Sequence, residues 1–382
     1  MKRLLIILIA IVFALTCVEF YFRGFRPQRT IATFDTQARC YLSDPITYVR
    51  FQPDSTCVFT NSEYNTSARI NSQGFRNNST FSTTKPEKTV RIAAIGDSYT
   101  FGQGVNDGVP FPNQLETILK SKGINSEVIN SGMPGSGVDW YYLTFLHYIK
   151  PLRPHMVIVG LYIGNDFSDL SYFSWATQNS DHLPTKLSAP FEHIDPDGAR
   201  RSMTLPFRYR LPVIRTSHVA QWISDSFFNT TIAPQVISLN GSRCMLDPNC
   251  HDLDPEIQTI VTLLSRMKKE GETHSTQIAV VLIPWEAQLP RNITQNTGMY
   301  IPNETNRTSF YNTVDAHLQN AGIPTIRILD AFSSYSGDTP LLYKVDGHWT
   351  ATGHKVAAEF IANNLLKRGF IKPSPPEALE ME

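Results

Sequence analysis

The chain has 382 residues, of which 41% are hydrophobic and 18% charged, and its 34 Lys and Arg balance 34 Asp and Glu. This length and composition are typical of a globular protein with one large or two smaller domains, and they exclude an intrinsically disordered chain. Without net charge the chain lacks the positive field of a nucleic-acid-binding protein, so no nucleic-acid partner is expected.

The N-terminus consists of a short basic segment and an apolar run. Lys2 and Arg3 precede residues 4–18, which are apolar almost throughout. The run is short for a full membrane span and long for the core of a signal peptide, and the aromatic residues 20–22 extend it towards a membrane interface. Because no small-residue cleavage pattern follows, residues 1–22 are predicted to be an uncleaved membrane anchor, with a removed signal peptide as the alternative.

Four of the five cysteines form two locally spaced pairs. The pairs are Cys40 with Cys57 and Cys244 with Cys250. An even number of cysteines behind an export-type segment predicts two disulfides in an oxidising compartment, with four unpaired thiols as the alternative. His251 follows Cys250 but lacks the paired ligand spacing of a zinc site, so no metal is expected there.

Residues 23–88 are polar and show no strong periodicity. They end in a Ser, Thr, Lys and Pro stretch at 82–86, so they are predicted to form an N-terminal extension and a linker. A domain with regular elements is expected over residues 89–370. Residues 371–382 contain three prolines and several glutamates and are predicted to be disordered.

From residue 90 onward, strand and helix patterns alternate. Strands are predicted at 90–95, 127–130, 156–163, 277–283 and 325–329, and helices at 111–122, 138–149, 256–269, 309–320 and 351–367. Nearly continuous apolar strands that alternate with helices indicate a parallel sheet covered on both faces. The predicted fold class is therefore α/β, a three-layer α/β/α sandwich with a doubly wound, mainly parallel sheet.

A long insertion, about residues 168–251, interrupts this alternation. A segment of this length inside a compact domain is usually functional or forms a subdomain of its own. Four of its aromatic residues are expected either to line a substrate pocket or to form the insertion's own small core. These are Tyr172, Phe173, Trp175 and Trp222. Trp285, directly after the fourth strand, is expected to line the site itself.

Four connections of the predicted sheet carry chemically useful residues at the edge where doubly wound sheets bind ligands. They are Gly96-Asp97-Ser98 after the first strand, the glycine-rich segment 130–137 after the second, Gly164-Asn165-Asp166 after the third, and Asp346-Gly347-His348 before the last helix. Each motif alone has an ordinary explanation as a turn or a helix cap. Their joint placement instead predicts a serine nucleophile, oxyanion donors and an imidazole paired with a carboxylate.

The expected chemistry follows from these residue types. A serine hydroxyl is a weak nucleophile that needs a neighbouring base, and histidine suits this role because its pKa lies near neutral pH. Amide donors stabilise the oxyanion of a tetrahedral intermediate. The sequence contains no phosphate-binding loop and no dinucleotide fingerprint, so no cofactor is expected.

In order and spacing, the four blocks resemble those of the SGNH (GDSL-like) hydrolase superfamily over about residues 89–368, apart from the insertion. Residues 69–77 also resemble the lead-in segment of membrane-anchored bacterial members. The resemblance implies a flavodoxin-like SGNH fold with Ser98 as nucleophile and first oxyanion donor. Further oxyanion donors would be the backbone N–H of Gly135 and the side-chain amide of Asn165.

The same resemblance implies that His348 is the base and that Asp346 orients it. In the common family pattern the aspartate lies three residues before the histidine, a position that Val345 occupies here. The Asp-x-His spacing resembles that of polysaccharide O-acetyltransferase-like members. The role of Asp346 is therefore less directly implied than that of His348, and a backbone carbonyl is the alternative partner of the imidazole.

Three functions remain open at this point. The first is an extracytoplasmic hydrolase of acyl, above all acetyl, esters of a glycan or lipid. The second is a polysaccharide O-acetyltransferase that uses the same serine and needs a membrane partner to supply the acyl group. The third is an anchored binding protein without turnover. All three place the domain in the periplasm or on the cell surface, or in the medium if the N-terminal segment is cleaved.

Overall fold

A computed structural model of the chain describes residues 2–25, 38–61, 63–170, 172–190, 192–202, 213, 216–227, 252–290, 293, 307–344 and 346–372. The predicted disulfide between Cys244 and Cys250 lies outside these residues. So do part of the insertion and nearly all of the tail that was predicted to be disordered.

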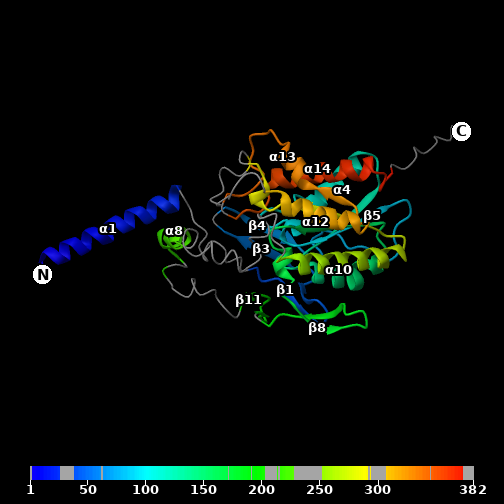
Figure 1. Ribbon diagram of the computed structural model, residues 1–382, viewed down its shortest axis with the longest axis horizontal. Helices are drawn as coiled ribbons and strands as arrows, with labels where there is room; N and C mark the ends of the chain where they lie inside the picture. The colour runs from blue at the N-terminus through cyan, green and yellow to red at the C-terminus, as the bar shows by residue number, and fades with distance from the viewer. Residues whose placement is uncertain are drawn as a thin grey trace.

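A five-stranded parallel sheet forms the centre of the molecule (Figure 1). Its strands, in spatial order, are β13 (Thr325–Arg327), β12 (Gln277–Ile283), β7 (Met156–Tyr162), β5 (Val90–Gly96) and β6 (Ser126–Gly132). Every pair of neighbours is parallel, and all seven residues of β7 are buried. This agrees with the nearly continuous apolar runs in the sequence and confirms the predicted fold class.

Helices cover both faces of the sheet. The packed pair α4 (Phe111–Ser121) and α14 (Ala351–Lys367), with α13 (Ile328–Ser333) against α14, forms one layer. In the other layer α10 (Asp254–Glu272) packs against both α5 (Val138–Thr144) and α12 (Ser309–Asn320). The three layers place the carboxyl ends of all five strands at one edge of the sheet.

Two predicted elements differ in kind from the observed ones. The last strand ends at Arg327, and the next two residues, which were predicted to continue it, begin α13. Ile328 and Leu329 are buried in this helix, and an apolar run alone does not distinguish a strand from a buried helix. The helix predicted over 138–149 is divided into α5 and a π-helical turn, Phe145–Ile149.

The N-terminal extension is more regular than predicted. It forms two antiparallel hairpins, β1 (Tyr41–Asp44) with β2 (Tyr48–Phe51) and β3 (Thr56–Thr60) with β4 (Asn65–Arg69). The prediction of an irregular linker was wrong here because these strands are only four or five residues long and rich in polar residues. Aromatic side chains of the hairpins pack on the nucleophile-bearing segment, with the rings of Phe51 and Phe101 5.0 Å apart.

Cys40 and Cys57 form the first predicted disulfide, which joins the two hairpins. Replacing Cys57 by alanine is expected to lower the free energy of unfolding by about 3 kcal/mol, because the crosslink closes a short loop in the unfolded chain. Urea denaturation of the full chain in detergent measures this. Cys17→Ala, at the exposed free cysteine, is the matched control and should leave the midpoint unchanged.

The described part of the insertion forms two further hairpins and a helix. The hairpins are β8 (Ser174–Gln178) with β9 (Pro184–Ser188) and β10 (Glu192–Ile194) with β11 (Arg200–Ser202), and the helix is α8 (His218–Phe227). Phe173 is buried in the domain, whereas Trp222 packs against Phe22 of the N-terminal helix, with ring centroids 5.3 Å apart. Trp222 therefore packs on a ring outside the insertion. Neither the predicted substrate pocket nor the predicted small core of the insertion included such a contact.

Candidate active site

Ser98 stands at a tight turn between the central strand β5 and the short helix α3 (Ser98–Phe101). The carboxylate of Asp97 caps this helix by accepting a hydrogen bond from the Tyr99 N–H at 2.9 Å. The turn requires glycine at position 96, because a Cβ there would lie 2.2 Å from the Thr100 hydroxyl and 2.8 Å from the Gly160 carbonyl oxygen. The turn holds the Ser98 side chain at the ligand-binding edge of the sheet.

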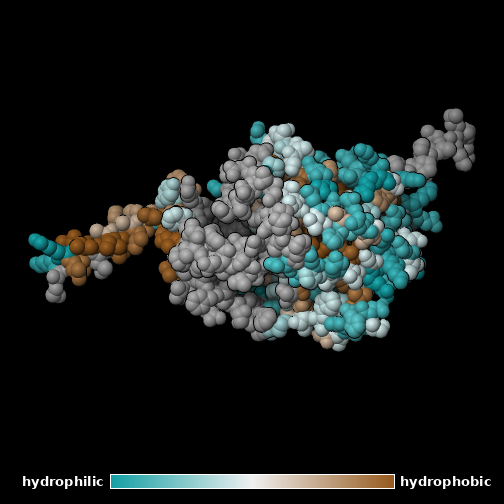
Figure 2. Space-filling view, viewed as in Figure 1, coloured by the Kyte–Doolittle hydropathy of each residue, from teal (hydrophilic) through white to brown (hydrophobic). Residues whose placement is uncertain are grey.

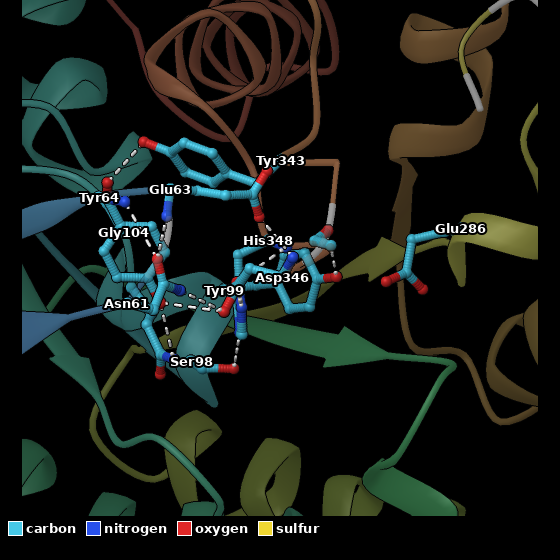
Figure 3. A network of polar contacts seen from close by, with 12 residues as sticks. Asn61, Glu63, Tyr64, Ser98, Tyr99, Gly104, Glu286, Tyr343, Asp346 and His348 are labelled. Carbon is cyan, nitrogen blue, oxygen red and sulfur yellow. Dashed lines mark hydrogen bonds and ion pairs between the residues drawn. The ribbon is translucent and has the colours of Figure 1, made fainter. Parts of the chain in front are cut away.

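His348 and Asp346 reach the same point from the connection before α14 (Figure 3). The Nε2 atom of His348 lies 2.7 Å from the Ser98 hydroxyl, and its Nδ1 atom is hydrogen-bonded to a carboxylate oxygen of Asp346. Gly347, between them, has a positive φ of 85°, a conformation that brings the two neighbouring side chains together. The Asp-x-His spacing therefore forms a continuous hydrogen-bonded chain from carboxylate to hydroxyl.

The turn between β3 and β4 completes this arrangement. The second carboxylate oxygen of Asp346 accepts hydrogen bonds from Asn61 Nδ2 at 3.1 Å and from the Tyr64 hydroxyl at 3.0 Å. Glu63 accepts hydrogen bonds from the backbone N–H groups of Lys344 and Asp346, at 2.7 and 2.6 Å. These three residues were not predicted as part of the site, because the segment that holds them is polar and shows no strong periodicity.

The loop after β6 lies beside the nucleophile turn. The Met133 N–H donates to the carbonyl of Gly96 at 2.9 Å, which fixes the start of the loop next to Ser98. At its other end, a Cβ on Gly137 would lie 3.2 Å from Asp169, in the short helix α6 (Asp166–Asp169) that follows Asn165. Gly135, exposed and with a φ of 66°, therefore lies between the first and third connections.

Asn165 precedes α6 at the end of β7. The carboxylate of Asp166 holds the turn by accepting hydrogen bonds from the Tyr162 N–H and the Tyr141 hydroxyl, both at 2.8 Å. The Oδ1 atom of Asn165 is buried without a hydrogen-bond partner. Within the described residues, Gly135 and Asn165 share the edge with Ser98 but make no hydrogen bond to it.

Residues 248–382 match a family described as "SGNH hydrolase-like domain, acetyltransferase AlgX". The matched segment contains α10, β12, α12, β13 and α14, together with Asp346 and His348. The C-terminal third of the chain is therefore similar to an SGNH hydrolase-like domain. No curated protein matches the sequence.

Several solved structures of low sequence identity are similar to the chain over about three quarters of its length. TesA is 12% identical with a TM-score of 0.40, covering 74% of this chain and 99% of its own. The lipase/acylhydrolase from Enterococcus faecalis is 14% identical with a TM-score of 0.40, covering 75% and 99%. The acetyl xylan esterase AlAXEase is 11% identical with a TM-score of 0.39, covering 72% and 100%. Likenesses this distant carry no argument about activity.

The charges around Asp346 and His348 favour an ionised carboxylate next to a basic imidazole. Burial alone raises the pKa of Asp346, but the charge and hydrogen bonds of His348 and the Tyr64 hydroxyl outweigh it and lower that pKa to about 2. Burial lowers the pKa of His348, yet Asp346, and then Asp97 and Glu286, outweigh it and raise the pKa above its usual value. The imidazole is therefore well suited to hold a proton taken from Ser98.

Tyr64→Phe is expected to lower the kcat of ester hydrolysis about tenfold with little change in KM, because a hydrogen bond to a charged group is worth about 1.5–3 kcal/mol. Steady-state kinetics on a p-nitrophenyl ester measures this. Tyr343→Phe is the matched control, since the Tyr343 hydroxyl donates to the Gly104 carbonyl at 2.7 Å instead of to the carboxylate. Equal losses in the two variants would contradict a role for Tyr64 in positioning Asp346.

Glu286→Gln is expected to move the acidic limb of the kcat/KM profile to lower pH by roughly half a unit. His348 acts as a base only when neutral, so activity falls as the pH drops through its raised pKa, and removing a negative charge nearby lowers that pKa. The Glu286 carboxylate, 2.7 Å from the Tyr162 hydroxyl, is one of these charges. A pH series compares this variant with Glu359→Gln, at an exposed position on α14, which should not move the limb.

Within the described ranges, no group of three or more His, Cys, Asp or Glu residues is arranged to hold a metal ion. That no metal or cofactor takes part is a prediction from the sequence. The assignment of Gly135 and Asn165 as oxyanion donors is likewise a prediction.

Proposed function

We propose that the SGNH domain is a serine esterase that acts through an acyl-serine intermediate, with Ser98 as nucleophile, His348 as base and Asp346 as the group that orients the imidazole. The observation that carries this proposal is the hydrogen-bonded chain from Asp346 through His348 to Ser98, with 2.7 Å between the imidazole and the hydroxyl. Nucleophile, base and orienting carboxylate in hydrogen-bond reach are the arrangement that serine acyl transfer requires.

In the proposed reaction, the Ser98 oxygen attacks the ester carbonyl carbon while its proton moves to Nε2 of His348. The resulting oxyanion is stabilised by the N–H groups of Ser98 and Gly135 and the side-chain amide of Asn165. His348 then returns the proton to the departing alcohol, and the acyl group stays on Ser98. A water molecule, which gives a proton to the same imidazole, then attacks the acyl-serine; the acyl group leaves as the carboxylic acid, and the proton returns to the Ser98 oxygen.

The proposed substrate is an acetyl ester of a glycan or lipid. The family description, which names an acetyltransferase, supports acetyl as the group transferred. The same description favours the second candidate, an O-acetyltransferase in which a sugar hydroxyl replaces water in the last step. A transferase of this kind would need a membrane partner to supply the acyl donor.

One experiment tests esterase activity and distinguishes the two acceptors. The full chain is incubated with p-nitrophenyl acetate, with and without a polysaccharide, and nitrophenol, acetate and acetylated sugar are measured. An esterase releases one acetate for each nitrophenol whether or not sugar is present. A transferase releases less acetate than nitrophenol when sugar is present, and the difference appears on the sugar. No nitrophenol from a folded sample would refute both.

We also propose that α1 (Lys2–Phe25) anchors the domain on the outer side of a membrane. The helix is long and apolar enough to cross a bilayer, and it forms the brown rod at the edge of Figure 2. A buried disulfide between Cys40 and Cys57 supports an oxidising compartment. Glu19 of α1 caps α8 by accepting hydrogen bonds from the N–H groups of His218 and Val219 at 3.0 and 2.9 Å.

Extraction of cell membranes at alkaline pH tests the anchor. The full chain should remain in the pellet, whereas a chain lacking residues 1–29 should be released. N-terminal sequencing of the mature protein then distinguishes an intact anchor from a cleaved signal peptide. Release of the full chain with an intact N-terminus would contradict the proposed anchor.

A further inference from the structure

The second hairpin of the insertion, β10–β11, touches the loop that carries Gly135. Arg200, at the start of β11, extends its guanidinium to this loop. Its Nη1 donates to the carbonyl of Pro134 at 2.6 Å and its Nη2 to the carbonyl of Gly135 at 2.9 Å. One side chain from the insertion therefore holds two successive peptide groups of the loop after β6.

The guanidinium is itself fixed from the other side. Its Nε donates to both carboxylate oxygens of Glu192, on the partner strand β10, at 2.6 and 2.8 Å. The Tyr172 hydroxyl donates to the same carboxylate, and the ring of Tyr172 lies 5.5 Å from the guanidinium carbon. The side chains of Arg200 and Glu192 are only 11% and 3% exposed, so water competes little for these bonds. The protein itself therefore engages three of the five N–H donors of Arg200, one on each guanidinium nitrogen.

The geometry of the peptide group gives this contact a consequence. In a trans peptide the C=O and the following N–H point in opposite directions, and the described residues contain no cis peptide. Because the Pro134 carbonyl points towards Arg200 and the hairpin, the N–H of Gly135 points away from the hairpin. Gly135 has a positive φ of 66°, a conformation that glycine enters and leaves easily. The hydrogen bonds from Arg200 therefore help to fix the backbone conformation of this loop.

We propose that Arg200 is a positioning residue that aims the Gly135 N–H at the developing oxyanion. This inference rests on the proposed serine esterase activity and deepens it. In this role of Arg200, the insertion contributes directly to the geometry of the active site. The role requires arginine, because a planar fork binds two carbonyls at once and a lysine ammonium does not reproduce this geometry.

The test is the rate at which an alkyl fluorophosphonate labels Ser98 in the full chain. In this reaction the Ser98 oxygen forms a bond to phosphorus, fluoride leaves, and the serine proton passes to His348. The attacked P=O oxygen gains negative charge, so the rate depends on the oxyanion donors. Arg200→Lys is expected to slow labelling about 10- to 100-fold, the range for a misplaced catalytic donor. Glu192→Gln, which loosens Arg200, should slow it less.

Arg39→Lys is the matched control. Arg39 pairs with Asp197 at 3.0 Å at the exposed tip of the same hairpin and contacts neither Pro134 nor Gly135 in the described structure. It should label at the wild-type rate. Steady-state kinetics adds a second readout, since a donor that acts only in the transition state lowers kcat and leaves KM almost unchanged.

The outcomes separate this inference from the proposed function. If the wild-type protein is not labelled at Ser98, the serine esterase proposal fails and this inference fails with it. If the wild-type protein is labelled at Ser98, and Arg200→Lys and Glu192→Gln are labelled as fast as the wild-type protein, only the role of Arg200 is overturned. Raised KM with unchanged kcat would also overturn it, because that pattern indicates substrate binding instead of oxyanion stabilisation.

Discussion

Replacing Ser98 by alanine is expected to reduce ester hydrolysis by about 10⁴-fold or more, because residues that act as one catalytic unit lose nearly all rate enhancement together. His348→Ala should cost about as much, since without a base the hydroxyl at 2.7 Å is a poor nucleophile. The double variant should be no slower than either single variant. Initial rates with p-nitrophenyl acetate at neutral pH measure all three.

Ser121→Ala is the matched control for Ser98→Ala. The Ser121 hydroxyl donates to the Ile118 carbonyl at the exposed end of α4, which leads into the start of β6 at the edge of the sheet opposite to Ser98. It should retain full activity. If the loss of rate in the double variant were the product of the losses in the two single variants, Ser98 and His348 would not act as one catalytic unit.

Asp346→Asn is expected to lower kcat by about 10⁴-fold, the loss seen when a triad aspartate becomes an amide and the imidazole takes the wrong tautomer. The structure explains which way the amide must face. One carboxylate oxygen already accepts hydrogen bonds from Asn61 and Tyr64, so the amide oxygen stays there and the amide nitrogen faces His348. Nδ1 of His348 must then accept, the ring proton moves to Nε2, and Nε2 can no longer take a proton from Ser98.

Two measurements check this argument. Nitrogen NMR of the imidazole should show the proton on Nδ1 in the wild-type protein and on Nε2 in Asp346→Asn. Asp338→Asn, at an exposed position, is the control and should change neither the tautomer nor the rate. An unchanged tautomer together with a 10⁴-fold loss would contradict the mechanism given for the loss.

The sheet could be predicted because its strands carry their signal locally. β7 reads as one apolar run and is buried along its whole length, and the helices between the strands have amphipathic spacing. The placement of Ser98 and His348 followed from the same reading, since the carboxyl ends of parallel strands meet at one edge. The disulfide between Cys40 and Cys57 was also predicted and is confirmed.

The residues that hydrogen-bond to the site from other segments could not be predicted in this way. Asn61 and Tyr64 lie 285 and 282 positions from the Asp346 carboxylate that they bind, so no local pattern relates them. Arg200 likewise lies 66 positions from the Pro134 carbonyl that it holds. Short hairpins bring these side chains into place through tertiary contacts, and strands of three to five residues give too few alternating positions to recognise.

In the proposed reaction, Ser98 carries the acyl group during turnover. The most direct test is to mix the full chain with p-nitrophenyl acetate, quench with acid within the burst phase, digest the protein and find the acetylated peptide by mass spectrometry. Acetyl is expected on the peptide that contains Ser98, and none on that peptide in Ser98→Ala. Nitrophenol release without acetyl on this peptide, or release that persists in Ser98→Ala, would contradict an acyl-serine intermediate at Ser98.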